Sequence, residues 1–252
     1  MTDYSKKSIA VHYFGHLRTF KECIPSHIEK IFSQNYHFDI FMHTWDENDR
    51  RTPSWYEVGS VRSVTPDEIQ MLKHALNPIN IIIETQNADI LTSIPYISSR
   101  RMHESLRKSI GLRTSTKGMR HYDLVATMRP DIKLNSTIPI GDLVELVKSE
   151  IFKNSVFSAS YSHKADGLFQ TDRMGARDCI CFGSESVMNK FEYIGLEETI
   201  YVKHPRQNGT GEIFFDNFVR NSCLSWQPIE YTAPVDWEIV REMVTEANRT
   251  YT

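Results

Sequence analysis

The sequence predicts an α/β protein, with a Rossmann-type, mostly parallel sheet flanked by helices in a single domain over residues 1–252. Short apolar segments alternate with amphipathic ones through the first two thirds of the chain, and this alternation produces parallel sheets through right-handed crossovers. The apolar segment at residues 124–128 is nearly uninterrupted, as in a central strand covered on both faces. No stretch of linker composition divides the chain.

The expected elements can be justified in chain order from period and end signals. In the first part, strands are expected at 8–15, 38–43, 80–86 and 124–128, and helices at 19–35, 65–76 and 98–119. The clearest helix start has Thr65 as cap, Pro66 at the first position and two acids in the first turn. In the last part, we expect helices at 142–152, 185–194 and 209–223, strands at 155–160 and 179–184, and a polar loop at 163–178 of the kind that often carries active-site residues.

Composition excludes several classes of protein. The formal net charge of −3 does not suggest a nucleic-acid partner, and the four cysteines include no CxxC pair that would suggest structural zinc. There is no GxGxxG or GxxxxGK[ST] motif, which argues against a dinucleotide dehydrogenase and a P-loop enzyme. No apolar run is long enough to span a membrane, and neither a signal peptide nor a disulfide pattern is apparent. A reducing cytoplasmic compartment is therefore expected.

Polar residues gather where three of the predicted strands end. Arg18 follows the first strand, His43 and Asp46 lie at the end of the second, and Arg129 and Asp131 follow the fourth. Parallel strands bring these ends to one edge of the sheet, where ligands of open α/β sheets bind. Arginine grips phosphate oxygens, and a carboxylate can hold Mg²⁺ or Mn²⁺ on a diphosphate. The sequence thus predicts a site for a phosphate-bearing substrate with a divalent metal, of which a nucleotide-sugar is one example, with Gly15 at the end of the first strand.

Each candidate also has a structural interpretation that the sequence leaves open. Arg18 could cap a helix or pair with Glu22, and His43 could be a hydrogen-bonded core histidine. Arg129 and Asp131 could form an ion pair that closes a surface turn. Glu212 could be an ordinary acid in the first turn of a helix, favoured there by the helix dipole.

Five segments together resemble bacterial glycosyltransferases encoded in capsule and lipopolysaccharide gene clusters. They are IAVHYFGHLRTF, FDIFMHTWD, YDLVATMRPDIKL, CICFGSESVMNKF and GEIFFDNFVRN, and the resemblance extends from about residue 8 to 224. It implies a GT-A-like fold, with a nucleotide-binding part at about 8–134 and an acceptor-side part at about 135–252. The first three segments are the more specific ones.

The resemblance also implies roles for acidic residues. Asp131 matches the metal-binding carboxylate of the family's acidic motif, although Arg129 occupies the place of the first acid, so a guanidinium could neutralise the diphosphate instead. Asp178 and Glu212 match later acidic positions, which usually hold the acceptor or act as the base. Asp172 competes with them for either role.

The expected function is transfer of a sugar from a nucleotide-sugar to a glycan or lipid-linked acceptor in surface polysaccharide biosynthesis, with Mn²⁺ or Mg²⁺ as cofactor. A nucleotide-dependent alditol-phosphate phosphotransferase and a non-catalytic nucleotide-sugar-binding protein are the alternatives. A lipid-linked acceptor implies work at the inner face of the cytoplasmic membrane, with weak, salt-sensitive attachment through the basic segment SSRRMHESLRK. A solvated helix face is the alternative for that segment. The sequence makes no prediction about oligomeric state or about inversion or retention.

Overall fold

The structure is a computed structural model, and it describes residues 6–49, 61–86, 97–116, 120–165, 168–171, 179–196 and 211–240. None of the helices in these ranges combines the length and the apolar character that a membrane-spanning helix requires.

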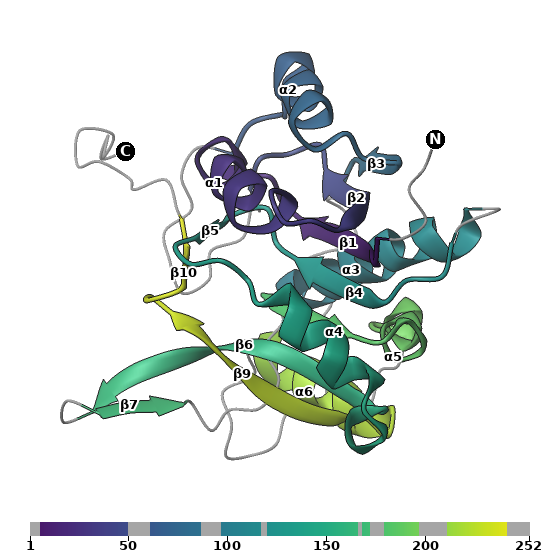
Figure 1. The fold of residues 1–252 in the computed structure, drawn as a ribbon. Coiled ribbons are helices and arrows are strands. Elements are labelled where there is room, and N and C mark those ends of the chain that lie inside the picture. Colours follow the sequence, from purple (N-terminus) through teal and green to yellow (C-terminus); the bar gives the residue numbers. More distant parts are fainter. Residues whose placement is uncertain are drawn as a thin grey trace.

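An eight-stranded sheet forms the centre of the molecule (Figure 1). Its order is β3–β2–β1–β4–β8–β6–β7, and β9 lies off this path and pairs with residues 155–161 of β6. The pairs among β3, β2, β1 and β4 are parallel, as is β6–β9, whereas β4–β8, β8–β6 and β6–β7 are antiparallel. The expected α/β class with a mostly parallel sheet is confirmed. The strands are β1 (Ser8–Gly15), β2 (His37–Trp45), β3 (Asn80–Glu84), β4 (Leu124–Met128), β6 (Ser155–Ala165), β7 (Leu168–Thr171), β8 (Ile180–Gly183) and β9 (Ser225–Ala233).

Helices cover both faces of this sheet because the residues of β1 alternate between two hydrophobic clusters. Ile9, Val11 and Tyr13 enter one cluster, and Ala10 and Phe14 enter the other. The first cluster is covered by α1 (Phe20–His27), η1 (Ile28–Phe32), α2 (Pro66–Leu76) and α4 (Ile140–Lys148). The second is covered by α3 (Ile97–Ser115), α5 (Glu185–Asn189), η3 (Lys190–Tyr193) and α6 (Gly211–Asn221).

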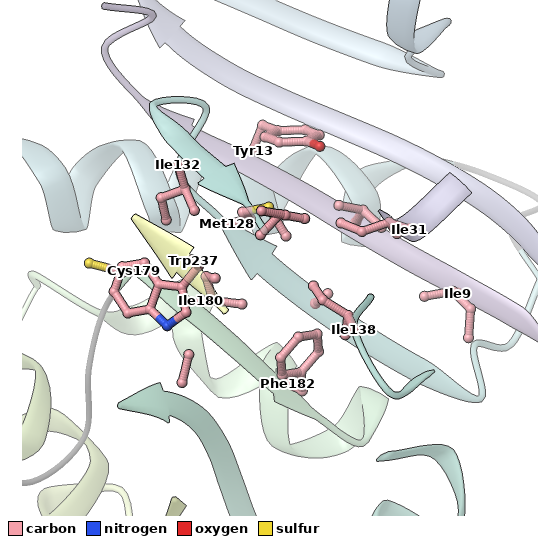
Figure 2. Close-up of a cluster of buried hydrophobic side chains, with 14 of the residues drawn as sticks. Ile9, Tyr13, Ile31, Met128, Ile132, Ile138, Cys179, Ile180, Phe182 and Trp237 are labelled. Carbon is pink, nitrogen blue, oxygen red and sulfur yellow. The ribbon is translucent and has the colours of Figure 1, made fainter. Parts of the chain in front are cut away.

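The first cluster extends beyond the main sheet. Figure 2 shows Met128 and Ile180 of the sheet together with Ile132 and Trp237, which come from a separate two-stranded ribbon. That ribbon pairs β5 (Ile132–Leu134) with β10 (Trp237–Ile239) in antiparallel register. Trp237 is fully buried, so the last described part of the chain is anchored in the core.

Several elements occur where the sequence predicts them. β1 and β4 have the expected bounds, and α2 begins with a complete capping box between Thr65 and Glu68. The expected strands at 38–43, 80–86 and 179–184 are present with slightly different ends.

Some expected helices are α-helical over only part of the predicted range. The helix predicted at 185–194 is α5 as far as Asn189 and continues as the 3₁₀ turn η3. The helix predicted at 19–35 is α-helical only as far as His27 and continues as the π-helix η1; Pro25, which has no N–H to donate, already interrupts its regular bonding. The helix predicted at 142–152 stops at Lys148, because Ser149 takes an extended conformation before the short 3₁₀ turn η2 (Glu150–Phe152).

The polar segment 163–178 was expected to be a loop, and this prediction is wrong for its first half. β6 continues to Ala165 and forms a hairpin with β7, because strand pairing satisfies the backbone whatever the polarity of the side chains. Residues 172–178 lie outside the described residues. β9 was not predicted; it contains Pro228, which is tolerated because the β6–β9 pairing is irregular just after this position.

Candidate functional site

The candidate site lies where β1 and β4 run side by side. β2 and β3 lie on one side of β1, and β4 lies on its other side, so the direction in which strands are added to the sheet changes between β1 and β4. The helices α1, which precedes β2, and α3, which precedes β4, lie on opposite faces of the sheet. Ligands of doubly wound sheets bind in the crevice beyond the carboxyl ends at such a reversal point. The loop after β1 carries Arg18, and the turn after β4 carries Arg129 and Asp131.

Two guanidinium groups converge on one buried carboxylate. Asp131 has no exposed surface. Arg129 donates from Nε to Oδ1 at 3.0 Å and from Nη2 to Oδ2 at 2.7 Å. Arg18 donates from Nη1 to Oδ2 of the same carboxylate at 2.9 Å. The Arg129–Asp131 pair of the structural interpretation is therefore present at the turn after β4, but its carboxylate is buried and does not lie at the surface.

A second acid, which the sequence did not single out, fixes the other edge of Arg18. Its Nε donates to Oδ1 of Asp49 at 2.7 Å, and its backbone N–H donates to the carbonyl of Asn48 at 2.8 Å. Arg18 also has a φ of 43°, a conformation that costs energy for a residue with a side chain. Arg18 therefore pairs with Asp49 and Asp131, and not with Glu22, the partner that the structural interpretation offered.

The end of the described chain crosses this cluster. The backbone N–H of Val240 donates to the carbonyl of Asp131 at 3.0 Å, and the hydroxyl of Thr19 donates to the carbonyl of Val240 at 2.8 Å. β10, anchored by Trp237, thus ties the loop after β1 to the turn after β4. This strand is not among the predicted elements, although the alternation of apolar and polar residues in WEI, 237–239, is a signal for it.

His16 lies beside the cluster as a neutral side chain. Gln86 donates an amide hydrogen to Nε2 at 3.0 Å, so the ring proton is on Nδ1, which donates to the carbonyl of Glu47 at 3.1 Å. Burial, reinforced by the nearby positive charge of Arg18, lowers the pKa of His16 to about 3. His16 therefore contributes no positive charge at neutral pH.

Of the predicted donor-site residues, the structure brings Arg18, Arg129 and Asp131 together. Gly15 has a φ of 95°, and its N–H donates to the hydroxyl of Ser105 at 2.7 Å. His43 has no exposed surface, and its Nδ1 lies 2.8 Å from the same hydroxyl. Burial lowers the pKa of His43 to about 4. Ser105 of α3, which the sequence did not suggest, thus joins β1 and β2 beneath the edge.

Asp46 lies at the same edge without contacting the arginines. Its Oδ2 accepts from the Thr85 hydroxyl at 2.6 Å. Its Oδ1 is buried and accepts no hydrogen bond from the residues that the structure describes.

The predicted acceptor-side acids can be located only in part. Asp172 and Asp178 lie outside the described residues. Glu212 belongs to the first turn of α6. Further along α6, the Phe215 ring lies 6.5 Å from that of His103, two residues before Ser105 on α3. The end of α6 lies at the opposite, amino edge, because β9 begins shortly after it with Ser225, which pairs with Ser155 at the start of β6. The first turn of α6 is therefore directed toward the carboxyl edge of the sheet. The four residues expected to anchor α6 in the core, Ile213, Phe214, Phe218 and Val219, are all buried.

The residues around Asp131 do not fit a divalent metal ion. Both of its carboxylate oxygens accept hydrogen bonds from positively charged guanidinium groups, and the carboxylate is out of reach of solvent. Among the described residues there is also no group of three or more His, Cys, Asp or Glu side chains that could hold a metal. The arrangement suits an anion, because it presents two oriented guanidinium groups at the rim of the sheet.

Comparison with protein-family models gives no match, and comparison with curated proteins gives no significant match.

Proposed function

We propose that this protein is a glycosyltransferase that takes a sugar from a nucleotide-sugar and passes it to a glycan or lipid-linked acceptor. The observation that carries the proposal is the position of Arg18 and Arg129, both oriented by Asp131, at the reversal point of a parallel sheet. Planar guanidinium groups match the geometry of phosphate oxygens and stay charged at every physiological pH. A nucleotide-sugar presents its diphosphate as such an anion.

The chemistry assigned to the arginines follows from where charge develops. As the bond between the sugar and the diphosphate breaks, negative charge grows on the leaving phosphate. Cationic donors fixed beforehand stabilise that charge without having to reorganise during the reaction. Each arginine side chain is 12% exposed, so both reach the surface at this edge.

Glu212 is the proposed base for deprotonating the acceptor hydroxyl if the configuration at the sugar is inverted. Support comes from the direction of α6, whose first turn lies toward the carboxyl edge. A carboxylate within hydrogen-bond reach of the hydroxyl is the usual choice for this role. Asp172 and Asp178 are proposed to hold the acceptor.

The resemblance to surface-polysaccharide glycosyltransferases supports a GT-A-like assignment of the fold and a cytoplasmic location at the inner membrane face. The proposed membrane contact through α3 gains little support. Arg101 is buried and donates to Gln86, and Lys108 pairs with Glu84 and Glu104. We therefore propose that any weak attachment to the membrane depends on binding of a lipid-linked acceptor rather than on contact of these cations with headgroups.

A thermal-shift panel of nucleoside diphosphates and nucleotide-sugars, with and without Mn²⁺, tests the class of ligand. We expect stabilisation by one nucleoside diphosphate and by its sugar conjugate, and none in Arg129→Ala. Arg220→Ala is the matched control, because Arg220 forms an exposed pair with Asp216 within α6. Stabilisation of Arg129→Ala equal to wild type would remove the arginine from the donor site.

The transferred group is identified by mass analysis of products formed with the stabilising nucleotide-sugar. A hexose or related sugar on the acceptor, or its slow release to water, supports a glycosyltransferase. Transfer of a phosphate-bearing alditol would indicate the phosphotransferase, and binding without turnover would indicate a binding protein.

Kinetics of Glu212→Gln test the proposed base. Removing the base should lower turnover by about a hundredfold with little change in donor affinity, whereas loss of an acceptor contact should mainly raise the acceptor KM. Asp172→Asn and Asp178→Asn are the comparisons, and near-normal turnover in Glu212→Gln rules out the assignment.

A further inference from the structure

We infer that Asp131 is a positioning residue and not a metal ligand, and that the two guanidinium groups it holds bind the donor diphosphate without a divalent metal ion. This inference rests on the proposed function for the identity of the donor. It departs from the resemblance, which assigns the carboxylate at this position to a metal.

The first argument concerns the lone pairs of Asp131. An ionised carboxylate has about four acceptor positions. Arg129 occupies one on each oxygen, and Arg18 occupies a further one on Oδ2. A metal ion bound directly to this carboxylate would have to displace at least part of a bidentate arginine contact.

The second argument concerns hydration and charge. Mg²⁺ gives up its water ligands reluctantly and requires nearly octahedral oxygen coordination. Asp131 has no exposed surface, and Pro130 and Ile132 beside it are also buried. A divalent cation there would also lie next to two guanidinium groups of the same sign. Burial and repulsion therefore both oppose a metal at this carboxylate.

The third argument is that the contacts of the cluster orient its arginines. Asp131 bonds to one edge of the Arg129 guanidinium, through Nε and Nη2, and this fixes the plane of the group. Arg18 is fixed from two directions, by Asp49 at Nε and by Asp131 at Nη1. Nη1 of Arg129 also donates to the sulfur of Cys179, at 3.9 Å. Because the arginine side chains are ordered before binding, they lose less conformational entropy when a ligand binds, so a fixed pair of arginines can take the place of a metal.

The test begins with the wild-type protein and needs no variant to fold. Calorimetry measures the Kd of the stabilising nucleoside diphosphate and of inorganic pyrophosphate in EDTA and again in Mn²⁺. We expect the two conditions to give Kd values within about threefold. Mn²⁺ alone is also titrated into the wild type and into Asp131→Asn. We expect the two proteins to give the same result, because Asp131 does not bind the ion.

Variants then separate positioning from structural support. Asp131→Asn keeps the size of the side chain but loses its charge, and Asp49→Asn does the same for Arg18 alone. In conditions where thermal unfolding shows each variant to be folded, we expect Asp131→Asn to weaken diphosphate binding about tenfold or more, equally in EDTA and Mn²⁺. Asp49→Asn should have a smaller effect. A residue that only supported the fold would lower the melting temperature and leave the Kd of the folded protein unchanged.

Each result of these measurements either supports or overturns the inference. Binding that needs Mn²⁺, or a wild-type Kd more than about threefold weaker in EDTA, overturns the inference while the proposed function stands. Metal-free binding of pyrophosphate that Arg129→Ala abolishes, without turnover of any nucleotide-sugar, supports the inference and counts against the function. No binding in either condition overturns both.

Discussion

Two clusters of paired arginine lie on the same sheet and have different surroundings. The edge cluster, at the carboxyl ends of β1 and β4, consists of Arg18, Asp49, Arg129 and Asp131. The helix cluster, between β1 and the helices on its second face, consists of His12, Arg113, Glu185 and Asn189. Arg113 donates from Nε to His12 at 3.0 Å, from Nη1 to Glu185 at 2.8 Å and from Nη2 to Asn189.

The difference lies in position and exposure rather than in pairing. Arg113 belongs to the regular helix α3, its side chain is 2% exposed, and its partners come from β1 and α5. Arg18 and Arg129 stand on loops at strand ends, each 12% exposed, and Arg18 has a strained backbone. An ion pair alone therefore does not mark a functional site. The edge cluster is the candidate ligand site because it lies beyond the carboxyl ends of β1 and β4, where open α/β sheets bind their ligands.

The largest expected effect is on stability at the helix cluster. Replacing Arg113 with methionine removes the buried partner of Glu185, which keeps its contacts to His121 and the Tyr122 N–H, and breaking a buried pair costs up to about 3–5 kcal/mol. Urea denaturation should show this loss, while the diphosphate affinity of the folded protein stays at the wild-type value. If the free energy of unfolding fell by less than about 1 kcal/mol, or if diphosphate binding weakened, the helix cluster could not be called structural in contrast to the edge cluster.

The next effect is on binding at the edge cluster. Arg18→Lys keeps the charge but cannot bond Asp49 and Asp131 at once with a planar fork. Without that orientation the side chain loses a charge-assisted contact to the diphosphate, which costs about 1.5–3 kcal/mol. Calorimetry should therefore show a diphosphate affinity about ten- to a hundredfold lower. If lysine substitutes without loss, charge alone matters at this position and the oriented geometry does not.

Acid should destabilise both clusters, since each contains or adjoins a buried histidine. Burial and the adjacent Arg113 lower the pKa of His12, and the pKa of His16 falls to about 3. Below the ordinary pKa of 6.5 the unfolded chain binds protons that the folded chain excludes, so the free energy of unfolding falls as pH falls. Each such histidine contributes about 1.4 kcal/mol per pH unit.

Urea titrations between pH 7.5 and 5 measure this dependence. His16→Gln should give a shallower slope than wild type, and diphosphate binding should change little, because His16 is neutral in the working range. An unchanged slope would mean that His16 takes up its proton in the folded state.

The smallest expected effect is a loss of stability at a helix cap that lies away from both clusters. It serves as a reference for the larger stability changes. Thr65→Ala removes the hydroxyl that accepts from the Glu68 backbone at the start of α2. Loss of such a cap costs about 1 kcal/mol. The same denaturation experiment should detect it with no change in binding, and a cost as large as that of Arg113→Met would call the stability scale into question.

Local patterns were sufficient to predict much of the fold and part of the site. The apolar run 124–128 and the capping signals at Thr65 depend on neighbouring residues alone, so β4 and α2 could be placed correctly. The parallel arrangement follows from the alternation of strands and helices, and parallel strands bring Arg18, Arg129 and Asp131 to one edge of the sheet.

The partners of these residues could not be predicted, because they come from distant parts of the chain. Asp49 lies 31 residues from Arg18, and Val240 meets Asp131 only because β10 returns to pair with β5. Whether a carboxylate holds a metal or an arginine depends on which groups surround it and on its access to water. The sequence by itself determined that charge gathers beyond β1 and β4. Only the tertiary structure decided that Asp131 is buried beneath both arginines, because burial and long-range contacts arise from the packing of the whole chain.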